Sequence, residues 1–211
     1  MKVSKYTKKT KLDLTLTLIV NLCKLNILWI FFTILGVVVA GIYPATVAAL
    51  IISRKWLLTK DYTVSVKEFY MHFKREFWSA NRAGIVFTIA GLVLYLNYDI
   101  MSNAAISLPI IVPIAFYIVL FSFITTIIWF FPLYVHRDNT LLQQVRNAFI
   151  LGVIKTPITL IQMISLFILF YFSLALPTML IFFTFAISVV LWMKWGLKGI
   201  LSVKFTVPVK S

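Results

Sequence analysis

The sequence alternates long apolar runs with two shorter polar segments. Apolar residues dominate positions 12–58, 83–135 and 157–195, and polar residues gather at 64–82 and 138–155. A membrane-spanning helix needs about 20 consecutive apolar residues, and each of the last two apolar runs is long enough for a hairpin of two such helices. The pattern predicts an all-α polytopic membrane protein with about five to six membrane segments.

We expect the whole chain, 1–211, to form a single integral membrane domain, with 196–211 as a cytoplasmic tail. Within the first apolar run, a helix over about 22–42 would be roughly 30 Å long, which is enough to cross a bilayer. Residues 43–57 would form a helix of only about 22 Å. The sequence therefore leaves open whether this second helix fully crosses the membrane or is re-entrant.

The first polar segment, 64–82, has the periodicity of an amphipathic helix. Phe69, Phe73 and Phe77 repeat every four residues among Lys, Arg and Glu. A basic helix with aromatic residues along one face is typical of a membrane surface. These three phenylalanines are therefore candidates for contacts with lipid or with a docked partner.

The second polar segment, 138–155, predicts a similar helix. An apolar stripe that begins at Leu141 alternates there with polar residues, which include Arg146. Asp138, Asn139 and Thr140 are each suited to cap its first turn. Arg146 is a further candidate for contacts with lipid or with a partner.

The basic residues predict the orientation of the chain. All of the Lys and Arg residues except Lys24 lie at the N-terminus, in or beside the polar segments, or near the C-terminus. Basic residues favour the cytoplasmic side of a membrane, so we expect both termini and both polar segments in the cytoplasm. Arg54, Lys55 and Trp56 end the first apolar run, as expected of an anchor at the cytoplasmic interface.

Composition agrees with the membrane class. Apolar residues make up 62% of the chain, charged residues make up 12%, and the mean hydropathy is +1.00. A soluble domain carries roughly 45–50% apolar and about 25% charged residues. The net charge of +14 lies in short segments between apolar runs, which argues against nucleic acid and for the anionic lipids of the inner leaflet as the partner. The single cysteine, Cys23, allows no intramolecular disulfide.

The sequence carries no motif for catalysis or for nucleotide binding. It has no GxxxxGK[ST], GxGxxG, HExxH, CxxC or GxSxG pattern, and no third ligand candidate accompanies His72 or His136. We therefore expect no enzyme activity, no cofactor and no metal. No carboxylate lies inside a spanning run, which weakens the case for a proton- or ion-coupled transporter.

Three polar residues enter the first apolar run. Asn21, Lys24 and Asn26 are spaced so that they could share one broad helical face. They would then contact a partner helix or line a cavity within the membrane. The alternative is that Lys24 lies near the cytoplasmic boundary and extends its ammonium group into water.

The order of four motifs resembles that of a known family. LNILW (25–29), GIYPATVAAL (41–50), SRKWL (53–57) and EFYMHFKREFWSANRAG (68–84) resemble the YesL-like integral membrane proteins of Gram-positive bacteria, a family of unknown function. Outside this block the resemblance rests on the spacing of the hairpins and on the second amphipathic helix. It implies a multi-pass protein of the cytoplasmic membrane, and it supplies no catalytic residues.

Genes of the YesL-like family often accompany carbohydrate uptake and breakdown systems, including ABC importers. The resemblance therefore implies an accessory membrane protein that acts with importer subunits. The alternative is a small-solute transporter in its own right, which predicts a polar cavity near the middle of the membrane. The sequence leaves open the solute, the partner and whether copies of the chain form a homo-oligomer.

Overall fold

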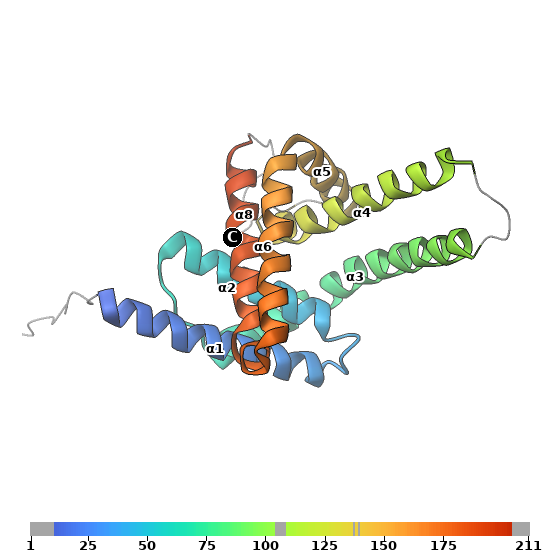
Figure 1. The fold of residues 1–211 in the computed structure, drawn as a ribbon. Coiled ribbons are helices and arrows are strands. Elements are labelled where there is room, and N and C mark those ends of the chain that lie inside the picture. Colours follow the sequence, from blue (N-terminus) through green and yellow to red (C-terminus); the bar gives the residue numbers. More distant parts are fainter. Residues whose placement is uncertain (1–10, 104–108, 137, 139, 204–211) are drawn as a thin grey trace, which may run out of the picture.

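All regular structure in the described part of the chain is helical (Figure 1). The computed structural model describes residues 11–103, 109–136, 138 and 140–203. Their elements, in chain order, are α1 (Lys11–Leu35), α2 (Ile42–Thr59), α3 (Val66–Ser102), α4 (Ile111–His136), α5 (Leu141–Ile154), α6 (Thr156–Ala175), α7 (Pro177–Met179), the π-helical turn η1 (Leu180–Thr184) and α8 (Phe185–Leu201). The predicted all-α class is confirmed.

Five stretches within these helices are long and apolar enough to cross a membrane. They are Thr15–Leu35 of α1, the whole of α3, α4 and α6, and the continuous stretch Pro177–Leu201. This finding agrees with the predicted five to six membrane segments and identifies the chain as a multi-pass membrane protein.

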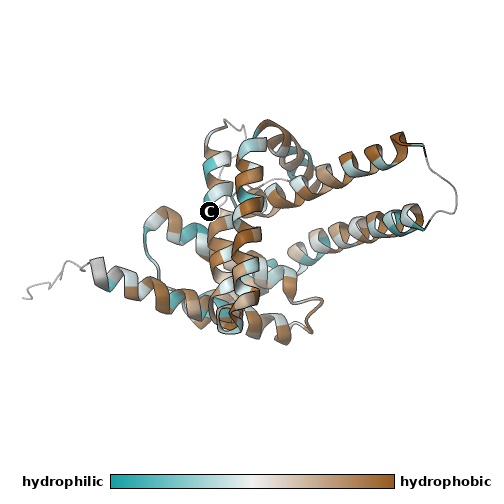
Figure 2. Cartoon of the chain, viewed as in Figure 1, coloured by the Kyte–Doolittle hydropathy of each residue, from teal (hydrophilic) through white to brown (hydrophobic). Residues whose placement is uncertain are grey.

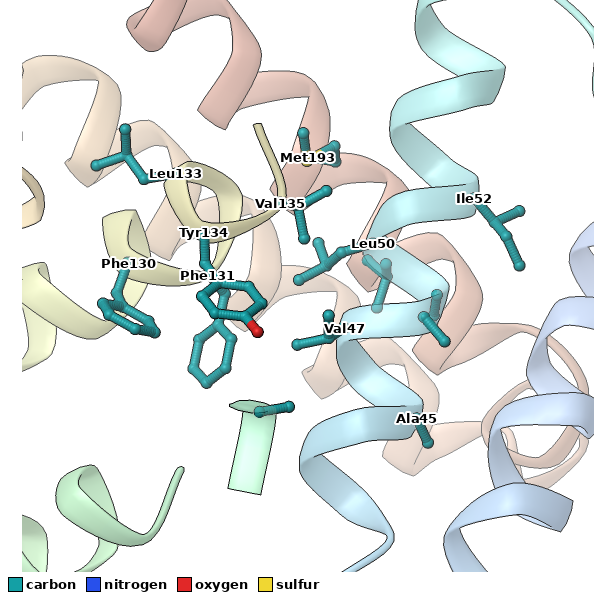
Figure 3. Close-up of a cluster of buried hydrophobic side chains, with 14 of the residues drawn as sticks. Ala45, Val47, Leu50, Ile52, Phe130, Phe131, Leu133, Tyr134, Val135 and Met193 are labelled. Carbon is teal, nitrogen blue, oxygen red and sulfur yellow. The ribbon is translucent and has the colours of Figure 1, made fainter. Parts of the chain in front are cut away.

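Helix α2 occupies the centre of the molecule, where it packs against α1, α3, α4 and α8. Figure 3 shows Val47 and Leu50 of α2 on the side that faces Phe131 and Val135 of α4. Most residues of α2 between Pro44 and Ser53 are buried. Because α2 meets protein on several sides, it does not need the uniformly apolar surface of a lipid-facing helix.

The connection between α1 and α2 is a closed turn that begins earlier in the chain than predicted. The first helix ends at Leu35 rather than near residue 42, and residues 36–41 form a turn. Val37 and Val38 adopt positive φ angles of 59° and 57°. A left-handed conformation is unusual for β-branched residues, and it costs about 1–2 kcal/mol per residue.

Glycines and hydrogen bonds hold this turn closed. A Cβ atom on Gly41 would lie 2.3 Å from the carbonyl oxygen of Thr33, so only glycine fits there. The N–H groups of residues 36–39, 41 and 42 all donate to carbonyl groups within 32–38. The side chain of Asn81, on α3, donates to the carbonyl of Ala40 at 2.9 Å.

The predicted end of a helix at residue 82 is wrong, because α3 continues past it. A separate surface helix over 64–82 was expected, whereas α3 runs unbroken through 37 residues, or about 55 Å. Ser65 caps its first turn, because the Ser65 hydroxyl accepts the N–H of Glu68 at 3.1 Å. Its first half packs against α2, and its apolar second half continues along the same axis.

Beyond Gly84, α3 and α4 form a hairpin that projects from the body of the molecule (Figure 1). Only 11% of the most apolar part of each helix is buried. Figure 2 shows the projecting part of α4 as predominantly hydrophobic. In a membrane, lipid or another membrane protein must therefore cover this hairpin.

Helix α5 packs along the end of α4. It follows Thr140, one of the three predicted caps, whose N–H bonds to the side chain of Gln143 at 3.3 Å. Leu141 and Phe149 of the predicted apolar stripe are exposed. The buried residues are Gln144, Ala148, Leu151 and Gly152.

The last hairpin, predicted within residues 157–195, reverses between Ala175 and Pro177. Its second helix, α8, reaches Leu201 rather than residue 195, and Gly196, Leu197, Gly199 and Ile200 are buried. The first residues of the predicted tail, 196–211, are therefore part of the packed helix. Residues 204–211 lie outside the described part of the chain.

Candidate functional site

Charged side chains gather at one end of the molecule, where α2 ends, α3 begins and α4 gives way to α5. We call this region the basic end. Two cavities of about 460 and 430 Å³ open there. They are neighbours, because Arg75 and Tyr134 line both of them.

The first cavity, which we call the Glu76 cavity, contains a buried carboxylate. Its lining residues are Arg75, Glu76, Ser79, Arg82, Tyr134, Asp138, Leu141 and Gln144. Glu76 is only 4% exposed. The hydroxyl of Tyr134 donates to one carboxylate oxygen at 2.7 Å, and Nε of Arg75 donates to the other at 3.1 Å. A buried charge is retained when it is paired and hydrogen-bonded in this way.

The second cavity, which we call the Arg54 cavity, combines basic and apolar side chains. Its lining residues are Ile51, Arg54, Lys55, Leu58, Thr59, His72, Arg75, Tyr134 and Val135. Nε of Arg54 donates to Nδ1 of the buried His136 at 3.1 Å. Because Nδ1 accepts this bond, it carries no proton. His136 thus fixes the position of the guanidinium group at the cavity wall.

Lys55 and Trp56 organise the connection between α2 and α3. Lys55 bonds to Glu68 at 2.9 Å and lies 3.8 Å from Asp61. The indole N–H of Trp56 donates to the carbonyl of Thr63 at 2.9 Å. Trp56 is only 1% exposed, so the expectation of a membrane-interface anchor is corrected. Its side chain holds the connection against the protein core instead.

The proposed aromatic docking stripe is also corrected. Phe69 and Phe73 are buried, and both rings pack against Phe32 of α1, with centroids 5.1 and 5.2 Å apart. Phe77 is half-buried and contacts Phe73 edge to face. Phe69 and Phe73 therefore contact this chain's own core and are not available to lipid or to a partner. Arg146, by contrast, is exposed on α5.

The two asparagines of the first apolar run make contacts within the chain. Asn26 is fully buried and joins α1 to the reversal before α8, since its side chain donates to the carbonyl of Ile181 at 2.5 Å and accepts the N–H of Ala186 at 3.0 Å. Asn21 accepts the N–H of Val64 at 3.3 Å.

Lys24 does not share the buried face of these asparagines. It is exposed and lines a further cavity, of about 440 Å³, with Ile27, Leu28, Val64, Ser65 and Val66. The structure thus brings Asn21 and Asn26 into helix packing and leaves Lys24 at the surface.

The residues that define the basic end were not all identified from the sequence. Glu76, Tyr134 and His136 are buried there. The helical period could have identified Glu76 as buried. Residues 69, 73, 76 and 80 are spaced alternately by four and three positions, which places them on one face of a helix. A strict four-residue spacing rotates by about 40° per step and selects Phe77 instead.

The polar side chains at the basic end include charged groups that can donate or accept hydrogen bonds. Within the described ranges, no cluster of three or more His, Cys, Asp and Glu side chains is placed to hold a metal ion. The fold and this site define a multi-pass helical membrane protein with charged cavities at one end.

Comparison with known proteins identifies the family. Residues 22–98 match the family described as "Protein of unknown function, DUF624". The chain is 34% identical over 160 residues to the uncharacterized protein YteU of Bacillus subtilis (strain 168), which covers 75% of this chain and 71% of YteU. The chain therefore belongs to the DUF624 family, and the resemblance to YesL-like proteins is confirmed.

Two further relatives come from the same organism. The uncharacterized protein YesV is 28% identical over 181 residues, which covers 86% of this chain and 87% of YesV. The uncharacterized protein YesL is 27% identical over 147 residues, which covers 69% of this chain and 68% of YesL. No solved structure matches the chain.

Proposed function

We propose that this protein is a non-enzymatic accessory component of the cell membrane that acts with a sugar ABC importer in a Gram-positive bacterium. In this proposal both termini and the basic end face the cytoplasm, as the distribution of Lys and Arg favours. The carbohydrate part of the proposal rests on the family resemblance, and the accessory part rests on the packing of α2.

The packing of α2 is the observation that favours an accessory role over transport. Ala45, Ala48 and Leu50 are fully buried in the centre of the molecule. Secondary transporters bind their substrates near the middle of the bilayer, between helices that line a polar cavity. Here apolar side chains fill the centre, and the charged cavities lie at the basic end.

The projecting α3–α4 hairpin supplies a surface on which an accessory protein can meet a membrane partner. Ile89, Leu92 and Val93 are exposed on α3, and Tyr117 and Ile118 are exposed on α4. Helices associate in membranes through close side-chain packing, and both arms of the hairpin offer such faces. We therefore expect importer subunits to contact this hairpin.

Copurification from native membranes tests the proposal. An affinity tag on the chain should recover importer subunits, identified by mass spectrometry, and an equally expressed unrelated multi-pass protein should not recover them. Replacement of Leu92 and Ile118 with tryptophan should reduce this recovery while the variant still inserts and folds. Recovery of no importer subunit by the native sequence would contradict the accessory role.

Reconstitution tests the alternative. Liposomes that contain only this protein should take up no sugar at a rate above protein-free liposomes. Uptake that saturates with sugar concentration would instead establish a transporter. A cysteine at Thr59 in a Cys23→Ser background should react with a membrane-impermeant reagent only from the cytoplasmic side, and a cysteine at Ser102 only from the outer side.

A further inference from the structure

The lining of the Arg54 cavity is basic. Arg54, Lys55, His72 and Arg75 line it, and none of its described lining residues is acidic. The neighbouring acids contact the cations from outside the lining, since Glu68 bonds to Lys55 and Glu76 bonds to Nε of Arg75. These contacts, together with Asp61 at 3.8 Å from Lys55, hold the cations in place at the cavity wall and partly offset their charge.

The two arginines are held in defined positions. His136 accepts from Nε of Arg54, and Glu76 accepts from Nε of Arg75. The guanidinium group is a rigid planar fork that recognises phosphate oxygens in pairs, so a fixed arginine loses little entropy when it binds one. Arg75 retains a side chain that is 53% exposed, which is accessible to an incoming ligand.

Apolar side chains lie beside the basic ones in the lining of the cavity. Ile51, Leu58 and Val135 face the same space as the four basic residues. The volume of about 430 Å³ lies within the range of small-molecule sites. A ligand that fits this lining combines an anionic group with an adjoining apolar surface.

From this geometry we propose that the Arg54 cavity binds a phosphate-bearing ligand. Arg54 and Arg75 hold the phosphate oxygens, Lys55 adds positive charge, the imidazole of His72 can donate a hydrogen bond, and the apolar side chains contact the adjoining part of the ligand. The same phosphate chemistry occurs in the headgroup of an anionic phospholipid and in a soluble sugar phosphate. This site is separate from the importer contact proposed above, so the two proposals stand or fall independently.

A specific binding site can be distinguished from the general attraction between basic residues and anionic lipid. Lys67 and Lys74 lie on the same helix as Arg75, are exposed, and do not line the cavity. General attraction depends on the total charge near the surface, so removal of any two cations would weaken it equally. The double variant Lys67→Gln/Lys74→Gln is thus the matched control for Arg54→Gln/Arg75→Gln.

The experiment measures thermal unfolding of the full chain in nanodiscs, because a ligand that binds the folded state raises the unfolding temperature. One arm increases the fraction of phosphatidylglycerol in phosphatidylcholine nanodiscs. The other arm adds inorganic phosphate or glucose 6-phosphate to nanodiscs of phosphatidylcholine alone. A response in the first arm only identifies a lipid headgroup, and a response to soluble phosphate identifies a soluble ligand.

We expect the native chain and the lysine control to respond alike. The arginine variant should bind about tenfold or more weakly, since each lost charge-assisted contact weakens binding substantially. Arg54→Lys/Arg75→Lys keeps the charge without the planar fork and should give an intermediate affinity, which separates loss of binding from loss of folding. No response to either probe, or equal weakening in the lysine control, would overturn the proposal.

Discussion

The α1–α2 and α3–α4 hairpins are both apolar, yet their side chains meet different surroundings. Helix α2 lies at the centre of the molecule, and most of its residues are in contact with α1, α3, α4 and α8. Helices α3 and α4 project beyond Gly84 with most of their apolar surface uncovered (Figure 1). Protein packing covers the apolar residues of α2, whereas lipid or another membrane protein must cover those of the α3–α4 hairpin.

Because of this difference, buried and lipid-facing apolar residues contribute unequally to the free energy of unfolding. A buried side chain in a packed core leaves a cavity when it is shortened. A lipid-facing side chain leaves a space that acyl chains can fill, because lipid is as apolar as leucine. Matched substitutions in the two hairpins should therefore have very different effects on the free energy of unfolding.

The largest contrast is expected between two leucines. Leu50 of α2 is 0% exposed and Leu92 of α3 is 56% exposed. Leu50→Ala should lower the free energy of unfolding by about 2–5 kcal/mol, whereas Leu92→Ala should change it by less than about 1 kcal/mol. Thermal and denaturant unfolding in detergent, followed by tryptophan fluorescence, measures both. Equal effects would remove the distinction between the two hairpins.

Two glycines of α3 provide the next contrast. A Cβ atom on Gly84 would lie 2.2 Å from the ring of Tyr43, whereas one on Gly91 would lie 3.5 Å from Phe123. Gly84→Val should cost about 1–3 kcal/mol through steric overlap where α3 meets α2. Gly91→Val should be tolerated. A Gly84→Val protein that unfolds at the native temperature would show that Tyr43 moves aside without cost.

A smaller contrast is expected between two asparagines. Asn81 joins α3 to the α1–α2 turn through the carbonyl of Ala40, whereas Asn97 bonds only to Val93 of its own helix. Asn81→Leu should lower the free energy of unfolding by roughly 0.6–2 kcal/mol, and Asn97→Leu should not lower it. The same unfolding assay compares them, and a stabilised Asn81→Leu would argue against a structural role for this bond.

The smallest effect concerns the turn itself and has the opposite sign. Val38 has a positive φ angle, and Val39 does not. Val38→Gly relieves the left-handed strain but increases the entropy of the unfolded chain, which leaves a net gain of roughly 0.5 kcal/mol. Val39→Gly has only the entropic effect and should be destabilising. A destabilised Val38→Gly protein would contradict the strain described here.

Much of the fold could be predicted from apolar run length and from turn residues. The last hairpin was predicted from the length of its apolar run, and the end of a helix near residue 57 was predicted as well. The unbroken α3 could not be predicted from the change in composition near Arg82, because that change alters what surrounds a helix without interrupting its hydrogen bonds. The helix end predicted at residue 82 therefore marks a change in the surroundings of α3 and not a break in the helix.

The candidate site was predicted less completely. Arg54 and Lys55 were selected by their position at the end of an apolar run, and they do line the Arg54 cavity. Tyr134 and His136 come from α4, more than 70 residues further along the chain, and only packing brings them beside α2. Periodicity shows which face of a helix is buried, and it does not show which helix covers that face.

The closed turn at residues 36–41 has a consequence for biosynthesis. Its sequence, GVVVAG, carries no charge, and the N–H groups of residues 36–39 and 41 donate to carbonyl groups within residues 32–38. Unsatisfied backbone groups are the main obstacle to placing a loop in hydrocarbon. The nascent chain can therefore leave the insertion machinery as a paired α1–α2 unit, without the cost of removing water from a polar loop. Helix α2 can then be in place before α3, α4 and α8 are synthesised.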